Sequence, residues 1–167
     1  MEALAEAHDR SRFSCDEPAL DRYFQTQVTQ DIRRKVTNCF VAIEQATGRI
    51  AAYYTLAASS IPAPQLPPAV VKRLPRYPLI PAVRIGRLAV DREFRSRGLG
   101  AALLTDATQR TLRAAPAAFA FVVDAKNDRA AAFYRHHGFL PFTSQPHTLF
   151  LPLATAAKAI GSAWGRK

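Results

Sequence analysis

The sequence predicts a mixed α/β fold in which one central sheet carries helices on its faces. Short apolar runs typical of strands alternate with longer segments whose apolar residues recur at helical spacing. A glycine-rich turn joins one predicted strand directly to a helix, and a hairpin pattern precedes it. With 167 residues, the chain is long enough for one domain with one core. This order of elements is typical of a sheet covered by helices.

The first part of the chain predicts two helices followed by a hairpin. Leu20, Tyr23 and Phe24 fall at i, i+3 and i+4, the spacing of one helical face. Two apolar runs flank a turn around Gly48, which is the pattern of a hairpin over 38–58. The elements expected here are helices over 17–27 and 30–35 and strands over 39–43 and 50–56.

Residues 59–82 contain seven of the twelve prolines, so we expect a structured loop there, with one short helix around 69–74. Gly138 lies where a helix would end, and Asn127 or Asp128 where the same helix would begin. The later elements expected are strands over 82–90, 118–123, 139–142 and 148–153 and helices over 99–114 and 129–137. Residues 1–153 are expected to form the single domain, and 154–167 a short basic tail.

The chain is strongly basic: 23 Lys and Arg against 13 Asp and Glu leave a net charge of +10. Such a charge favours a polyanionic partner, because attraction to phosphates accumulates over many contacts. A basic surface that aids solubility, or that serves the phosphates of a cofactor, is the simpler reading. The first thirty residues contain no apolar stretch typical of a signal peptide, so we expect a soluble, intracellular protein without a membrane segment.

Two cysteines, Cys15 and Cys39, lack the close spacing of a zinc or redox pair, and we interpret both as packing residues. We expect no metal site.

The turn between the strand over 82–90 and the next helix is a candidate anion site. Backbone N–H groups and the positive end of the helix dipole converge at such a turn, so a diphosphate can bind without any side chain. Gly98 and Gly100 permit close approach of the backbone, while Arg95 and Arg97 add positive charge. No Lys followed by Ser or Thr comes after the second glycine, which excludes a nucleotide P-loop. Two glycines at a turn can also be there for steric reasons alone.

Two segments together resemble the GNAT superfamily of acetyltransferases, over roughly residues 83–142. The motif Arg95-x-x-Gly98-x-Gly100, preceded by Ile85–Asp91, is similar to the acetyl-CoA motif of that family, and 127–139 is similar to its Asn…Ala…Phe-Tyr…Gly-Phe segment. The resemblance implies a mostly antiparallel sheet of about six strands, with helices on both faces. It also implies that acetyl-CoA binds with its pyrophosphate on the glycine turn. The cofactor-binding residues that it implies are Leu88, Ala89, Val90, Arg95, Ser96, Arg97, Gly98, Leu99, Gly100, Asn127, Ala131 and Phe133.

A closer resemblance links most of the chain to GNAT toxins of bacterial toxin–antitoxin loci. It is carried by the segments 13–15, 20–24, 53–56, 73–78 and 148–153. The resemblance implies an enzyme that acetylates the α-amine of aminoacyl-tRNA and so blocks translation. It further implies a ribbon-helix-helix antitoxin as partner, a homodimer and a cytoplasmic location.

Acetyl transfer to an amine needs a neutral nucleophile, a stabilised oxyanion and a proton for the leaving thiolate. Resemblance to the family implies that Tyr134 donates this proton, and that a backbone N–H of Leu88–Val90 stabilises the oxyanion. A tyrosine in the core is the simpler reading of Tyr134. Four residues are candidates by type for a general base, and none belongs to a recognisable constellation: Glu93, Asp124, His136 and His137. A base can also be unnecessary, because a free α-amine has a pKa of about 7.7 to 8.

Two basic groups are candidates for contact with RNA, although such clusters are more often solvated faces. They are Arg33, Arg34 and Lys35 in one group and Lys72, Arg73 and Arg76 in the other. Two other functions remain open: an N-acetyltransferase for a small amine or a protein N-terminus, and a nonenzymatic RNA-binding module.

Overall fold

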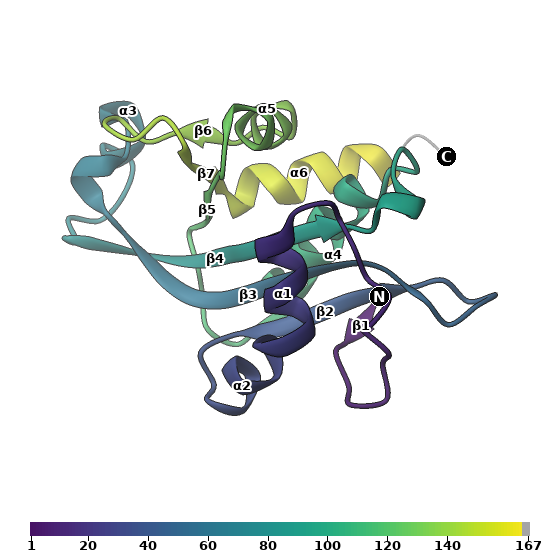
Figure 1. The fold of residues 1–167 in the computed structure, drawn as a ribbon. Coiled ribbons are helices and arrows are strands. Elements are labelled where there is room, and N and C mark those ends of the chain that lie inside the picture. The colour runs from purple at the N-terminus through teal and green to yellow at the C-terminus, as the bar shows by residue number, and fades with distance from the viewer. Residues whose placement is uncertain (165–167) are drawn as a thin grey trace. The chain divides into compact units, whose positions relative to one another are not determined.

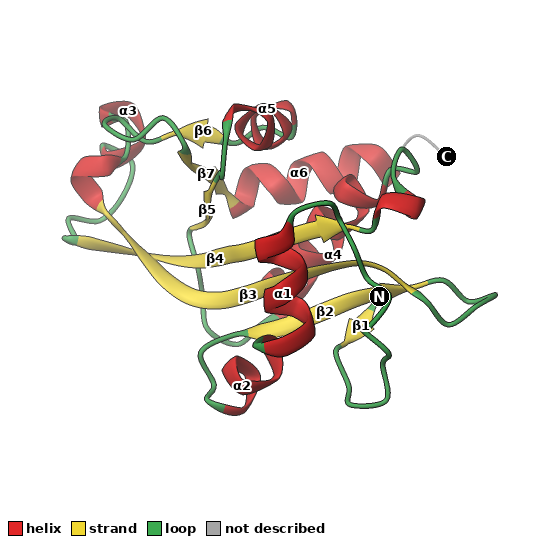
Figure 2. Ribbon diagram, in the orientation of Figure 1, coloured by secondary structure: helices red, strands yellow, loops and turns green. Residues whose placement is uncertain are grey.

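The computed structural model describes residues 1–164. Seven strands form one sheet in the order β1-β2-β3-β4-β5-β7-β6, and helices accompany it (Figures 1 and 2). The mixed α/β class is therefore confirmed. The sequence predicted about six strands, and the strand that it missed is β1, Glu2–Ala3. This strand is too short to leave an alternating pattern in the sequence.

The contacts within the chain divide it into two compact units. The first unit comprises Met1–Ala57 and Ile85–Ala107, and the second comprises Ala58–Arg84 and the chain from Thr108 onward. Each unit is described by itself below. Whether residues 1–153 form a single domain stays a prediction.

The first unit holds the N-terminal helices and the predicted hairpin. Phe24 on α1 stacks on Tyr53 of β3 with ring centroids 4.1 Å apart, and Phe13 meets Tyr53 edge-on. Both free cysteines are buried in this cluster, as their interpretation as packing residues required. Strands β2 and β3 pair antiparallel from Asn38 opposite Leu56. The elements of this part are α1 (Pro18–Thr26), α2 (Val28–Arg33), β2 (Asn38–Ile43) and β3 (Ile50–Pro62).

The middle of the chain departs most from the sequence prediction. The expected loop over 59–82 is strand at its two ends, because β3 continues to Pro62 and β4 begins at Leu79. Between these strands, the short helix expected around 69–74 is present at Pro68–Val71. Proline lacks an N–H donor, and Pro62 takes the last position of β3, where the strand ends. The elements between and after are η1 (Ala63–Gln65), α3 (Pro68–Val71), β4 (Leu79–Val90), η2 (Arg92–Phe94) and α4 (Leu99–Arg113).

The second unit carries the remaining strands. Ala82–Arg84 of β4 pair in parallel with Ala120–Val122 of β5, and β5 pairs antiparallel with β7. A second core cluster includes Ile61, Phe142 and Phe150. The elements are β5 (Ala120–Asp124), α5 (Asp128–His136), β6 (Leu140–Pro141) and β7 (Thr148–Pro152).

Up to Trp164, the expected basic tail is a helix, α6, which spans Leu153–Trp164. Residues 165–167 of the expected tail lie outside the described residues. Leu153 and Ala156 are buried, and Ile160 is half-buried, so an i, i+3, i+7 stripe packs in this unit. Alanines dominate the segment and favour helix over coil. Among the residues that the structure describes, no helix is both long and apolar enough to cross a membrane.

Candidate functional site

Asp91, at the end of β4, organises the approach to the glycine turn. Its carboxylate is 1% exposed and accepts the N–H of Glu93 at 2.9 Å, which caps η2. The same carboxylate accepts the N–H of Ser14 at 3.0 Å. Because a buried carboxylate must be hydrogen-bonded, Asp91 holds the end of the strand and the N-terminal segment in one arrangement.

The glycine turn leads directly into α4. Ser96 and Gly98 both have positive φ, 61° and 73°, and the Gly98 carbonyl accepts the N–H of Ala102 at 3.1 Å in the first helical turn. The N–H groups at the start of a helix have no acceptor within it, so those next to Gly98 are available to a ligand. The loop is exposed, and a positive φ suits glycine at position 98. The predicted turn that leads into a helix is present, and anion binding by its backbone donors stays a prediction.

The two arginine side chains of the turn have local partners. Arg95 pairs with Asp16 at 3.0 Å and donates to the Cys15 carbonyl. Arg97 lies over the ring of Phe94, 5.1 Å from its centroid. In this arrangement the backbone forms the cradle, and the guanidinium groups brace it while adding positive charge.

The N-terminal segment is fastened to this loop, a feature that spacing alone did not reveal. Ser14 bridges the two parts, because its N–H donates to Asp91 and its carbonyl accepts the N–H of Arg92 at 2.8 Å. Asp21, on α1, accepts the N–H of Cys15 at 2.9 Å. The start of α1 and the end of β4 next to the glycine turn are thus held by one hydrogen-bond network.

The second predicted part of the site is α5. Of the two residues that the sequence offered as its N-cap, Asn127 takes this position, and its side-chain oxygen accepts the N–H of Ala130 at 2.9 Å. Tyr134 follows on the same helix and is 8% exposed, and its burial raises the pKa of the phenol to about 12. Its ring meets Phe133 and Phe139 edge-on at 5.2 Å. Within residues 1–164 the Tyr134 hydroxyl makes no hydrogen bond, so this buried phenol keeps its proton free to donate.

The remaining predicted cofactor residues are spread over both units. The turn and Leu88–Val90 belong to the first unit, whereas Asn127–Tyr134 belong to the second. Leu88–Val90 lie in β4 after Ala82–Arg84, the stretch that pairs with β5. Ala131 is fully buried, and the ring of Phe133 packs on the ring of His137 with centroids 4.5 Å apart. Contact of each with acetyl-CoA stays a prediction.

The four candidate bases have structural partners or lie at a helix end. Glu93 pairs with Arg49, and this hydrogen bond holds the pKa of the Glu93 carboxyl below its usual range. Asp124 pairs with Arg84 and accepts the Thr148 hydroxyl at 2.9 Å. His137 places Nδ1 2.8 Å from the Phe133 carbonyl, and His136 is exposed beside it.

All six residues of the two basic groups are exposed. Arg33 pairs with Glu6 at 3.1 Å, with both side chains largely in solvent. The first group lies at the end of α2 in the first unit, where Arg33 is the last helical residue and Arg34 and Lys35 follow it. The second group, formed by Lys72, Arg73 and Arg76, follows α3 in the second unit. Exposure is compatible with both the RNA-contact and the solvated-face interpretation.

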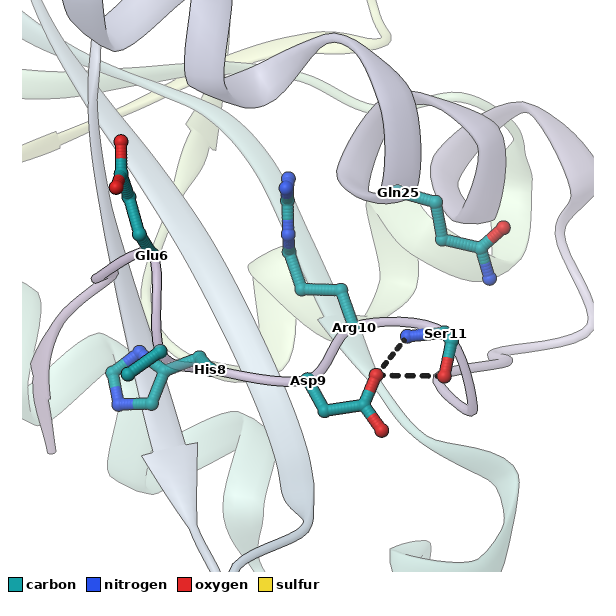
Figure 3. A pocket seen from close by; sticks show the side chains of 7 residues that line it. Glu6, His8, Asp9, Arg10, Ser11 and Gln25 are labelled. Carbon is teal, nitrogen blue, oxygen red and sulfur yellow. Dashed lines mark hydrogen bonds between the residues drawn. The ribbon is translucent and has the colours of Figure 1, made fainter.

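An open hollow of about 620 Å³ lies beside the N-terminal segment, lined by Glu6–Ser11 and Gln25 (Figure 3). Asp9 binds both the N–H and the hydroxyl of Ser11, and Arg10 donates to the Phe24 carbonyl at 2.7 Å. These hydrogen bonds stabilise the N-terminal segment, and none of the predicted site residues lines the hollow.

Comparison with known proteins agrees with this geometry. The model of the acetyltransferase (GNAT) domain matches residues 35–141. A tRNA-acetylating toxin of Mycobacterium tuberculosis is 34% identical over 160 residues, which cover 95% of this chain and 94% of the toxin. A strand, a glycine turn that opens a helix, and a family model over most of the chain establish that the chain belongs to the GNAT acetyltransferase family.

Solved structures of GNAT toxins are similar over nearly the whole chain. A tyrosine-to-phenylalanine mutant of KacT has a TM-score of 0.86 at 26% identity, covering 95% of this chain and 96% of KacT. AtaT complexed with acetyl-methionyl-tRNA has a TM-score of 0.84 at 29% identity, covering 95% and 97%. A tyrosine-to-phenylalanine mutant of AtaT, bound to the C-terminus of the antitoxin AtaR and acetyl-CoA, has a TM-score of 0.77 at 26% identity, covering 95% and 96%.

Proposed function

We propose that this protein is a toxin of a toxin–antitoxin pair that uses acetyl-CoA to acetylate the α-amine of aminoacyl-tRNA and so blocks translation. The observation that carries the proposal is similarity along almost the full chain to a tRNA-acetylating toxin, at 34% identity. AtaT, with 29% identity, has been captured with acetyl-methionyl-tRNA. A ribbon-helix-helix antitoxin, a homodimer and a cytoplasmic location belong to the same proposal.

Acetyl-CoA supplies an acetyl group activated as a thioester, and the glycine turn fits its pyrophosphate. The positive φ of Gly98 and the N-terminus of α4 provide the backbone donors that a diphosphate needs. Leu99 and Gly100 would donate N–H groups, and Arg95 and Arg97 would add charge without direct contact. The backbone at Leu88–Val90 would polarise the acetyl carbonyl.

Tyr134 would supply the proton for the leaving thiolate as the α-amine forms its bond to the acetyl carbon. The pKa of about 12 keeps the phenol protonated at neutral pH. The α-amine loses its own proton to water, since a free α-amine has a pKa of about 7.7 to 8 and an adjacent ester lowers it. A protein lysine, at about 10.4, would need a base, and the candidate bases have partners or lie at a helix end. This difference favours an aminoacyl acceptor.

The test is acetylation of a complete pool of charged tRNA with labelled acetyl-CoA. We expect label on charged tRNA and none on the deacylated pool, because only the former offers an α-amine. Identification of the acetylated amino acids then defines the specificity. An active enzyme that acetylates no charged tRNA but turns over a small amine or a peptide N-terminus would instead be a general N-acetyltransferase. A chain that binds no acetyl-CoA would be an RNA-binding module.

A further inference from the structure

Arg87, on β4, is part of the recognised motif, but the mechanism above gives it no role. Its guanidinium carbon lies 3.4 Å from the centroid of the Tyr23 ring. At this short distance the guanidinium lies over the face of the phenol ring in a cation–π contact. Arg87 is half-buried, so its cation is partly withdrawn from water.

The Arg87 guanidinium has no acidic partner among the residues that the structure describes. Other arginines near the site are paired: Arg49 with Glu93, Arg84 with Asp124, and Arg95 with Asp16. A half-buried cation whose hydrogen-bond donors are unused is suited to receive an anion.

Both ends of Arg87 are held in place. Its backbone N–H donates to the Thr55 hydroxyl at 3.0 Å, and Thr55 is 1% exposed. A Cβ at Gly86 would lie 2.9 Å from the same hydroxyl oxygen, so this close approach requires glycine. At the other end, Tyr23 donates its hydroxyl to Asp31 at 2.9 Å, which fixes the ring on which the guanidinium stacks.

The direction of the side chain identifies the class of ligand. Ala89, two residues along β4, lies in the same core cluster as Tyr23, so Arg87 faces α1 and α2. Arg87 also immediately precedes Leu88–Val90, where the acetyl carbonyl is proposed to bind. An amino acid esterified to tRNA has no free carboxylate, and the anion nearest to its ester is the phosphate of the terminal nucleotide.

We propose that the Arg87 guanidinium, stacked on Tyr23, binds the phosphate of the terminal nucleotide of charged tRNA and so positions the aminoacyl group. This inference rests on the proposed acetylation of aminoacyl-tRNA. Thr55, Gly86 and Tyr23 act through Arg87 and are positioning residues.

The test compares two competitors that differ by one phosphate: a 3′-aminoacyl-amide adenosine and its 5′-monophosphate. Each is titrated against acetylation of charged tRNA by the wild type, Arg87→Ala and Arg87→Lys. For the wild type, the phosphate should tighten inhibition by at least about tenfold, typical of a hydrogen bond to a charged group. In Arg87→Ala that advantage should vanish, while the compound without phosphate inhibits equally in both proteins. Arg87→Lys should keep part of the advantage that the phosphate gives, because lysine keeps the positive charge but lacks the planar group that stacks on Tyr23.

Charged tRNA itself provides a second readout. Arg87→Ala should raise KM at least about tenfold with a smaller change in kcat. The salt dependence of tRNA binding should weaken by about one unit of slope, as expected for one lost phosphate contact. Arg113→Ala is the matched control, because it removes one exposed arginine on α4. Affinity for acetyl-CoA should stay unchanged in all three variants.

An unchanged phosphate advantage in folded Arg87→Ala would overturn the inference, and so would equal weakening of both competitors. These outcomes differ from failure of the proposed function, in which the wild type itself acetylates no charged tRNA. In that case the inference falls with it.

Discussion

At the scale of single residues, Tyr134 combines a buried ring with a hydroxyl that no residue within 1–164 engages. Tyr134→Phe removes the proposed proton donor and almost no volume, so the aromatic contacts with Phe133 and Phe139 should persist. We expect kcat to fall on the order of a hundredfold or more, the usual effect of losing a general acid. Single-turnover acetylation of charged tRNA measures this, and calorimetry should show unchanged affinity for acetyl-CoA. Wild-type turnover where chemistry limits the rate would return Tyr134 to a packing role.

The pKa of Tyr134 also predicts the shape of the pH profile. Burial raises this pKa to about 12, and an acid acts only while protonated, so its contribution is complete at any pH well below that value. The acceptor amine behaves oppositely, since it reacts only when neutral. We therefore expect kcat/KM to rise to a plateau near pH 8, with no decline up to about pH 10. A decline below pH 10 that disappears in Tyr134→Phe would mean that the phenol ionises in this range, which would contradict the pKa of about 12.

At the scale of elements, the strand-to-helix turn can be tested by a change that introduces bulk and negative charge. Gly100→Glu places a carboxylate at the N-terminus of α4, where the pyrophosphate is proposed to bind. We expect calorimetric affinity for acetyl-CoA to be lost. Gly161→Glu on α6 is the matched control, because a side chain there meets open space. Full affinity in a folded Gly100→Glu variant would disprove the assignment.

The cap of α5 is a second prediction at this scale. Asn127 accepts the N–H of Ala130, and Asn127→Ala leaves this exposed end of the helix without its side-chain acceptor. Urea denaturation should show a loss of about 1 kcal/mol in the free energy of unfolding, while Asn127→Asp keeps the acceptor and most of the stability. If Asn127→Asp is as unstable as Asn127→Ala, the side-chain cap is not what Asn127 contributes to stability.

At the scale of the whole molecule, the net charge of +10 should appear in the salt dependence of tRNA binding. Each contacted phosphate releases condensed counterions, so affinity should fall steeply as salt rises. Replacing Arg33, Arg34 and Lys35 by Ala, and separately Lys72, Arg73 and Arg76, shows which group contacts RNA. A contacting group flattens the slope of log affinity against log salt and leaves acetyl-CoA affinity intact. Unchanged slopes in both triple variants would make these groups solvated faces.

Local patterns account for what the sequence determined by itself. The helices α1, α4 and α5, the cap at Asn127 and the glycine turn depend on neighbours a few residues apart, so periodicity and turn chemistry were enough to predict them. The class of fold followed from their order. The motif segments led to the acetyltransferase family, which the comparisons confirmed.

Long-range contacts decided the rest. The strand character of Ser59–Pro62 and Leu79–Pro81 depends on partners elsewhere in the sheet, and the proline count alone predicted a loop. Likewise, Asp16 and Arg95 are far apart in sequence, and so are Tyr23 and Arg87, yet each pair is in contact. The chemistry of an arginine depends on whether an acid or a ring lies beside it. Only the folded chain brings those neighbours together. Arg95 lies beside the acid Asp16 and forms an ion pair with it, whereas Arg87 lies on the ring of Tyr23 and is a candidate to bind an anion.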